Sequence, residues 1–214
     1  MIAIQPIVRG INHSRPDPDL IRSAAEVLRN EGIVAAPTET RYGLLASIDS
    51  NDALQRLFNL KRRQATLPTA IFVGQRNKIK KFGVENDVSK KLAEEFLPGP
   101  MTIVLKAAVS RPAPIVANGK IGIRISSSAV IAGIMEYINF GLTATSANLS
   151  GSDEQATISE IVNLFGSGVD LYLDAGPLTG KPSTVVDCLE DGYNILRVGA
   201  ICELDISRCL VGTA

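Results

Sequence analysis

Short apolar runs alternate with segments of helical periodicity along almost the whole chain. Residues 33–36, 101–105 and 142–145 have the length and composition of buried strands. Residues 17–32 begin with aspartates, keep apolar side chains at helical spacing and end at a glycine, which is typical of an amphipathic helix. The sequence contains no repeat, low-complexity stretch or evident linker. The alternation therefore predicts an α/β protein with a mixed β-sheet and helices packed on it.

Composition limits the class of protein further. With 214 residues and 45% hydrophobic content the chain can bury a full core, and we expect a single domain over residues 1–214. The formal net charge is zero, so any basic surface has to be local. Three cysteines without paired spacing argue against a zinc site or a disulfide framework. No apolar run approaches the roughly 18 residues of a membrane span. We expect a cytoplasmic protein that does not associate with membranes.

The residue inventory also limits the catalytic chemistry. His13 is the single histidine and lies in a polar N-terminal segment, which argues against a Ser-His-Asp or Cys-His enzyme. Residues 176–182 approach a phosphate-binding loop but have a proline where a hydroxyl must hold magnesium. Residues 166–168 lack the third glycine of a dinucleotide fingerprint. Any bound phosphate should therefore be held by side-chain cations and hydroxyls.

Two hydroxyl-rich segments follow predicted strands. Residues 37–44, Pro-Thr-Glu-Thr-Arg-Tyr-Gly-Leu, come directly after the run 33–36, and residues 146–151, Ser-Ala-Asn-Leu-Ser-Gly, come after the run 142–145. Because α/β proteins place ligands at the carboxyl ends of strands, both segments are candidates for a binding site. In the alternative interpretation they are turns whose hydroxyls bond to nearby backbone. The first segment alone does not separate these two interpretations.

Lys61 and Arg124 are cations with apolar neighbours. The second predicted helix has Leu54 on its core face, and a step of about seven residues along that face reaches Lys61, which should then point inward. In the alternative, Lys61 and the two arginines after it form a cationic helix end that satisfies the macrodipole. Arg124 lies between two isoleucines, so it is either an edge or solvent-facing residue or a buried cation that needs an anion.

Seven motifs occur in one order along the chain. They are Pro37–Thr40 with Tyr42–Leu44, Lys61 with Arg63, Pro98–Pro100 before Thr102, Gly122–Arg124, Thr145–Gly151, Ser183–Asp187, and Arg197 with Gly199. This series resembles the YrdC family, and the resemblance spans roughly residues 17 to 200. It implies a twisted mixed sheet flanked by helices around a concave basic cleft, an α/β fold similar to double-stranded-RNA-binding proteins.

The best-known members of that family are L-threonylcarbamoyladenylate synthases. They condense L-threonine, bicarbonate and ATP, release pyrophosphate, and supply the threonylcarbamoyl group for tRNA modification. The resemblance implies ATP with Mg²⁺, and it admits tRNA or double-stranded RNA and a downstream tRNA-modifying transferase as partners. Such a condensation needs positioning and charge stabilisation more than acid–base groups, which agrees with the residue inventory. No carboxylate cluster in the sequence identifies a metal site, so the magnesium is expected to arrive on the phosphates.

The resemblance also implies roles for individual residues. Those that resemble contacts to threonine are Thr40, Arg124 and Ser183. Those that resemble contacts to the nucleotide are Arg63, Lys120, Ser146 and Arg197. The pair that resembles the catalytic cations, which neutralise phosphate or carbamate charge, is Lys61 and Arg63.

Some positions depart from the family pattern. Leu67 and Phe72 stand where synthases commonly have a polar or basic residue and a histidine, and Arg41 replaces an apolar or aromatic residue. Losing two polar contacts of about 1 kcal/mol each would weaken substrate binding about tenfold or more. These departures favour a YciO-like paralogue that binds RNA or nucleotide without efficient synthase activity. The intact segment 146–151 and the intact pair of Lys61 and Arg63 favour the synthase.

We expect substitutions of Arg124 and Lys61 to affect stability little. We expect the charge of Arg124 to stay unpaired until an anion arrives, so Arg124→Leu should be neutral or stabilising without ligand. We expect Lys61→Ala to remove activity and leave the fold intact, because it removes phosphate-facing charge and no core volume.

Overall fold

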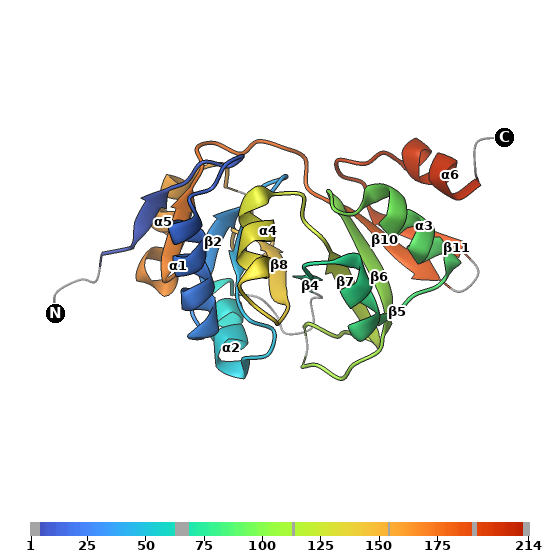
Figure 1. Ribbon diagram of the computed structural model, residues 1–214, viewed down its shortest axis with the longest axis horizontal. Helices are drawn as coiled ribbons and strands as arrows, with labels where there is room; N and C mark the ends of the chain where they lie inside the picture. The colour runs from blue at the N-terminus through green and yellow to red at the C-terminus, as the bar shows by residue number, and fades with distance from the viewer. Residues whose placement is uncertain (1–4, 63–68, 113, 154, 190–191, 212–214) are drawn as a thin grey trace.

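The computed structural model describes residues 5–62, 69–112, 114–153, 155–189 and 192–211. Within these residues the strands form one mixed, 11-stranded sheet in the order β1-β9-β2-β3-β8-β4-β7-β6-β10-β11, with β5 paired to β6 (Figure 1). The α/β fold with a mixed sheet is therefore confirmed. The strands are β1 (Val8–Gly10), β2 (Val34–Pro37), β3 (Tyr42–Leu45), β4 (Ala70–Phe72), β5 (Gly83–Val84), β6 (Met101–Ala107), β7 (Lys120–Arg124), β8 (Leu142–Ser146), β9 (Leu171–Asp174), β10 (Thr184–Leu189) and β11 (Gly192–Arg197).

Several of the helices begin at side-chain caps that the sequence provides. Asp17 caps the first helix by accepting from the backbone N–H of Asp19 at 2.8 Å. Thr157 and Glu160 form a capping box, and the hydrogen bonds from Thr157 lower the pKa of the Glu160 carboxyl. The helices are α1 (Pro18–Arg29), α2 (Asn51–Leu60), α3 (Asp87–Phe96), α4 (Ala129–Glu136), α5 (Ile158–Phe165) and α6 (Glu203–Val211), with short 3-10 segments at Arg76–Lys81 and Gly166–Gly168.

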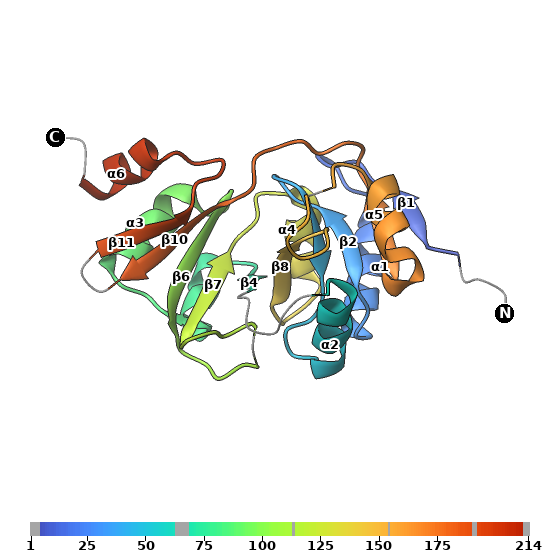
Figure 2. The same cartoon turned by 180° about the vertical axis from the view of Figure 1, so that it is seen from behind.

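Two hydrophobic clusters fill the space between the sheet and its helices. In one, Leu28 of α1 and Ile131 of α4 pack on Val34 and Leu171 of the sheet. The other cluster includes side chains of α2, α3 and α5. Figure 1 shows α1, α4 and α3 on the near side, whereas Figure 2, from behind, shows α2 and α5 and the open face of β6, β7 and β10.

Several predicted segments differ from the structure. The run 37–44 is not only an exit from a strand, because Pro37 turns back through residues 38–41 into β3 and pairs with Tyr42 in an antiparallel hairpin. The apolar residues at 2–8 predict a first strand there, but β1 begins at Val8; residues 1–4 lie outside the described part of the chain. The sequence patterns also do not predict β3, β5 or the C-terminal α6. Within the described residues, no helix is both long enough and apolar enough to span a membrane.

Candidate substrate-binding cleft

A cleft of about 350 Å³ lies over the open face of β6, β7 and β10 and extends to the β2–β3 turn and β8. Pockets for small ligands typically measure about 300–1,000 Å³. The structure therefore brings together hydroxyls and cations that are far apart in the sequence. The sequence-predicted site residues that line the cleft are Thr40, Lys120, Arg124, Ser146, Ser183 and Arg197.

Arg124, at the end of β7, is a buried cation that already has an anion. Its side chain is 8% exposed, and Nη2 donates to Oε1 of Glu39 at 2.8 Å and to Oγ1 of Thr40 at 2.9 Å. The guanidinium also lies over the Phe72 ring, 5.5 Å from its centroid. The prediction that Arg124 stays unpaired until a ligand arrives is therefore wrong. Its Nε, however, is buried without a hydrogen-bond partner among the described residues.

The two threonines of the β2–β3 turn have different roles. Thr38 bonds to the local backbone, because its Oγ1 donates to the carbonyl of Arg41 at 2.7 Å and accepts from the N–H of Thr40 at 3.1 Å. Thr40 instead directs its hydroxyl to Arg124 inside the cleft. The turn interpretation is therefore confirmed for Thr38, whereas a binding role for Thr40, which lines the cleft, stays a prediction.

Residues 175–183 connect β9 to β10 and pass over the β2–β3 turn (Figure 1). Tyr42 holds the start of this connection, because its hydroxyl donates to the carbonyl of Gly176 at 2.7 Å and accepts from the N–H of Ala175 at 2.9 Å. Burial raises the pKa of Tyr42 to about 12, so this donor stays protonated at neutral pH. A Cβ at Gly180 would lie 2.7 Å from the carbonyl oxygen of Thr40. The connection therefore helps to fix the position of Thr40.

We expect Gly180→Ala to disturb the cleft. The added Cβ must push apart two backbone segments, which should lower the free energy of unfolding by about 1–3 kcal/mol. It should also displace Thr40 from Arg124. Gly10→Ala is the matched control, since a Cβ there meets nothing within 4 Å. Urea denaturation of both variants measures the difference, and equal stabilities would contradict the close approach at Thr40.

Ser183 and Arg197 meet at the other side of the cleft. Nη2 of Arg197 donates to the carbonyl of Ser183 at 2.9 Å and to its Oγ at 3.0 Å. The same hydroxyl lies 3.1 Å from Oγ1 of Thr102. A predicted threonine contact and a predicted nucleotide contact are thus neighbours.

Lys61 follows the end of α2 and points inward, as its register predicted. It is 1% exposed, and Nζ donates to the backbone carbonyls of Ser146 and Asn148, the latter at 2.7 Å. The alternative of a solvent-facing helix end is therefore wrong for Lys61. Its ammonium holds the segment after β8 in place, and Ser146 Oγ in turn donates to Oδ1 of Asn148 at 2.6 Å. Arg63 lies outside the described residues.

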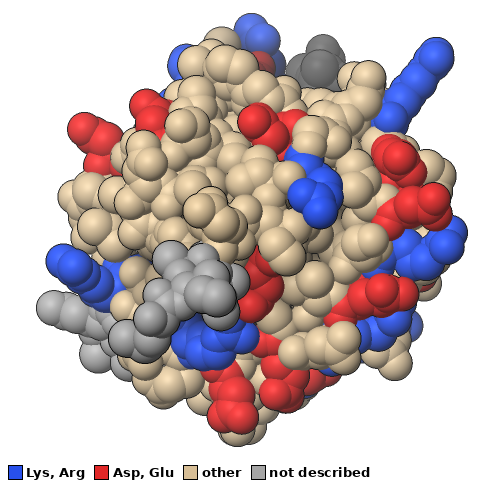
Figure 3. Space-filling view, turned by 90° about the vertical axis from the view of Figure 1, so that its left-hand side faces the viewer, with Lys and Arg blue, Asp and Glu red and all other residues tan. Residues whose placement is uncertain are grey.

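Lys120 pairs with a carboxylate at the far end of the cleft. Its Nζ forms an ion pair with Oδ2 of Asp187, whose side chain is 11% exposed. Oδ1 of Asp187 is buried without a partner among the described residues. Since Lys120 and Arg124 both have anionic partners, the basic character of the cleft stays a prediction. Figure 3, which views the molecule from the left-hand side of Figure 1, shows charges of both signs on that face, in keeping with the zero net charge.

Sequence reasoning assigned no role to Glu39 and Asp187, and treated Phe72 only as a departure. All three contact cations of the cleft: Glu39 and Phe72 contact the buried Arg124, and the buried carboxylate of Asp187 contacts the exposed Lys120. The available signal was the rule that a buried cation needs an anion, applied to the carboxylates of the same motifs.

The geometry defines a class of protein. The cleft presents hydroxyls and oriented cations. Burial raises the pKa of the Cys188 thiol to about 12, so this cysteine is not a thiolate nucleophile. Such a site suits an α/β protein that positions anionic substrates.

Comparison with known proteins shows the family. A family model described as Sua5_yciO_yrdC, telomere recombination, matches residues 26–199, and the chain belongs to this family. A Methanocaldococcus jannaschii protein, provisionally assigned as a threonylcarbamoyl-AMP synthase, is 38% identical over 84% of this chain and 86% of its own. YciO of Escherichia coli is 25% identical over 88% of this chain and 93% of its own. Further relatives named threonylcarbamoyl-AMP synthase are 28–30% identical, and the chain spans 57–69% of their length.

A solved structure supports the same assignment. The structure of Pyrococcus abyssi Sua5 complexed with L-threonine has a TM-score of 0.88 and 28% identity to this chain. The match covers 95% of this chain and 61% of the Sua5 chain. The resemblance to the YrdC family is therefore confirmed.

Proposed function

We propose that this protein is an L-threonylcarbamoyladenylate synthase that condenses L-threonine, bicarbonate and ATP and releases pyrophosphate. The observation that carries the proposal is the buried guanidinium of Arg124, whose Nε has no partner among the described residues and which lines the cleft. An α-carboxylate is a good acceptor for this group. Relatives of the chain are named for this activity.

Different residues of the cleft would bind threonine and the nucleotide. Arg124, Thr40 and Ser183 would bind threonine, with the carboxylate on Arg124. The threonine amine would form a C–N bond to the carbon of bicarbonate with loss of water, which gives a carbamate. A carbamate oxygen would then attack the α-phosphorus of ATP, and the bond from that phosphorus to the leaving pyrophosphate would break. Positioning and charge stabilisation supply most of the acceleration in such a step, so no protein nucleophile is needed.

Cations and hydroxyls on the other walls would bind the nucleotide. Ser146, Lys120 and Arg197 line the cleft with their side chains. Lys61 would act by fixing the segment that carries Ser146, and Arg63 is the proposed cation for the phosphates. This division differs from the sequence prediction for Lys61, because its ammonium is bound to backbone carbonyls.

Magnesium would arrive on the phosphates of ATP. Among the described residues, no group of three His, Cys, Asp or Glu side chains could hold a metal ion. Asp187 offers one buried carboxylate oxygen, which by itself does not make a six-coordinate site. We therefore propose MgATP as the substrate, the cytoplasm as the location, and a tRNA-modifying transferase as the consumer of the product.

Pyrophosphate release tests the proposal. The purified protein should release pyrophosphate from ATP when L-threonine, bicarbonate and Mg²⁺ are all present, and omission of any one should reduce release to background. Substrates should be tested well above typical concentrations, because Leu67 and Phe72 predict weaker binding. If pyrophosphate is released equally with and without threonine, the protein is not an L-threonylcarbamoyladenylate synthase.

We expect L-serine to be a poorer substrate than L-threonine. It lacks the methyl group that Thr40 and its neighbours would enclose, and one missing methyl group costs about 1–3 kcal/mol. The kcat/KM for serine should be lower by about 10–200-fold. Equal values for the two amino acids would place the methyl group outside the cleft.

A YciO-like binding protein is the second candidate. The observation that favours it is the pairing of Lys120 and Arg124 with carboxylates, which lowers the attraction of the cleft for phosphate. Such a protein would bind RNA or nucleotide without bicarbonate-dependent chemistry. Phe72 favours it less than the sequence implied, because its ring supports Arg124.

A further inference from the structure

Glu39 is a buried carboxylate that lies behind Arg124. Its side chain is 13% exposed. One oxygen accepts from Nη2 of Arg124 at 2.8 Å, and the other accepts from the hydroxyl of Ser126. Glu39 is not among the residues that line the cleft, whereas Arg124 is. Glu39 therefore does not contact a ligand in the cleft directly, and it can affect one through its charge and through the orientation of Arg124.

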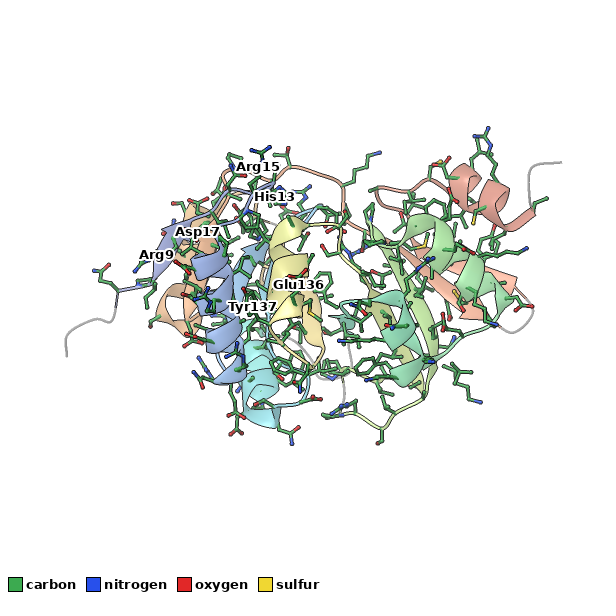
Figure 4. All side chains as sticks on the ribbon, in the orientation of Figure 1. Arg9, His13, Arg15, Asp17, Glu136 and Tyr137 are labelled. Atoms are coloured by element: carbon green, nitrogen blue, oxygen red, sulfur yellow. The ribbon has the colours of Figure 1, made fainter. Side chains whose placement is uncertain are left out.

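A hydrogen-bond network holds Glu39 in place. Oγ of Ser126 accepts from the N–H of Ser128 at 3.2 Å. Oγ of Ser128 donates to the carbonyl of Pro37 at 3.1 Å and lies 3.4 Å from Nε2 of His13. Figure 4 shows His13 beside the start of α4, at the outer end of this network. The β2–β3 turn, the end of β7 and the start of α4 are thus joined at Glu39.

This arrangement fixes the orientation of the Arg124 guanidinium. Glu39 and Thr40 occupy Nη2, and Phe72 supports the guanidinium plane. Nε is left without a partner among the described residues. Glu39 also cancels the charge of Arg124 in the empty cleft.

Charge balance has a consequence for selectivity. An unpaired buried arginine attracts any anion, and phosphate is a strong ligand for it. With Glu39 behind it, the pair is neutral, so a phosphate dianion gains little from long-range attraction. An amino-acid zwitterion carries no net charge and is not disfavoured by Glu39. The pair therefore suits the zwitterion better than the phosphate groups of ATP or pyrophosphate.

We propose that Glu39 is a positioning residue that orients Arg124 for an amino-acid carboxylate and keeps phosphate out of that subsite. The inference rests on the proposed function, because it takes threonine as the ligand of Arg124. Glu39→Gln retains an acceptor for Arg124 but removes the charge, whereas Glu39→Ala removes both. The two roles are therefore separable by experiment.

The test measures binding of L-threonine, inorganic phosphate and ATP to the full chain by titration calorimetry. For Glu39→Ala, the Kd of threonine should rise about tenfold, whereas the Kd of ATP should not rise. For Glu39→Gln, the Kd of threonine should stay within about threefold of wild type, and phosphate should bind about tenfold more tightly and compete with threonine. The control is Glu136→Gln, which makes the same substitution at an exposed residue on α4, labelled in Figure 4.

The outcomes distinguish this inference from the proposed function. Equal phosphate binding by wild type and Glu39→Gln would overturn the inference, and so would unchanged threonine binding by Glu39→Ala. If Glu39→Ala does not fold, the phosphate titration of Glu39→Gln still decides. A wild-type protein that binds no threonine would instead refute the proposed function, and the phosphate titration would still test the charge balance at Arg124.

Discussion

Replacement of Arg124 by leucine is expected to destabilise the ligand-free protein by about 3–5 kcal/mol and to abolish its stabilisation by threonine. The reason is Glu39, which would keep its buried position and lose the cation 2.8 Å away. This reverses the expectation from sequence, in which Arg124 had no anion and its loss was harmless. Urea denaturation with and without threonine measures both effects.

The double variant Arg124→Leu/Glu39→Leu is the matched control. When both charges are removed, no buried carboxylate is left unpaired, so much of the lost stability should return. Threonine should still fail to stabilise this variant. A single variant as stable as wild type, or a threonine response that survives it, would show that Arg124 does not have the role proposed for it.

Lys61→Met is expected to lower both stability and activity strongly. Methionine keeps most of the side-chain volume, but the carbonyls of Ser146 and Asn148 lose their donor. Buried acceptors without a partner cost about 1–3 kcal/mol each, so we expect a loss of about 2–5 kcal/mol. The segment 146–151 should then lose its position, and kcat/KM should fall by about 100-fold or more.

Arg62→Met is the control for Lys61→Met. It removes the same charge from the adjacent, exposed residue. Thermal unfolding and pyrophosphate release should be near wild type for this variant. If the two variants behave alike, Lys61 contributes only charge at the end of α2, as in the interpretation that the structure argues against.

The fold class and the inward position of Lys61 were predictable from periodicity, because both depend on local patterns of apolar side chains. The partner of Arg124 was not. To identify Glu39 as the partner of Arg124, one would need to know that β2 and β3 pair antiparallel. Residues 37–44 contain too few alternating apolar positions to predict that hairpin from the sequence. Likewise, the contact between Lys61 and the segment after β8 joins residues that lie 85 and 87 positions apart.

The candidate site was predicted in outline because its residues occur in motifs. Six of its members line one cleft, but the sequence did not indicate which cations are already paired. Pairing depends on the register between β6, β7 and β10, which places Lys120 beside Asp187. The burial of Arg124 was left open for the same reason, since isoleucine neighbours fit both an edge strand and a central one.

Transfer of label from bicarbonate to an adenylate tests the proposed synthase activity most directly. The protein is incubated with ¹⁴C-bicarbonate, L-threonine, ATP and Mg²⁺, and the products are separated at once because the adenylate is labile. The account predicts labelled threonylcarbamoyl adenylate, formed with pyrophosphate and only when all four components are present. Binding of ATP and threonine without any labelled product, together with tight, salt-sensitive binding of RNA, would contradict the account and identify a binding protein instead.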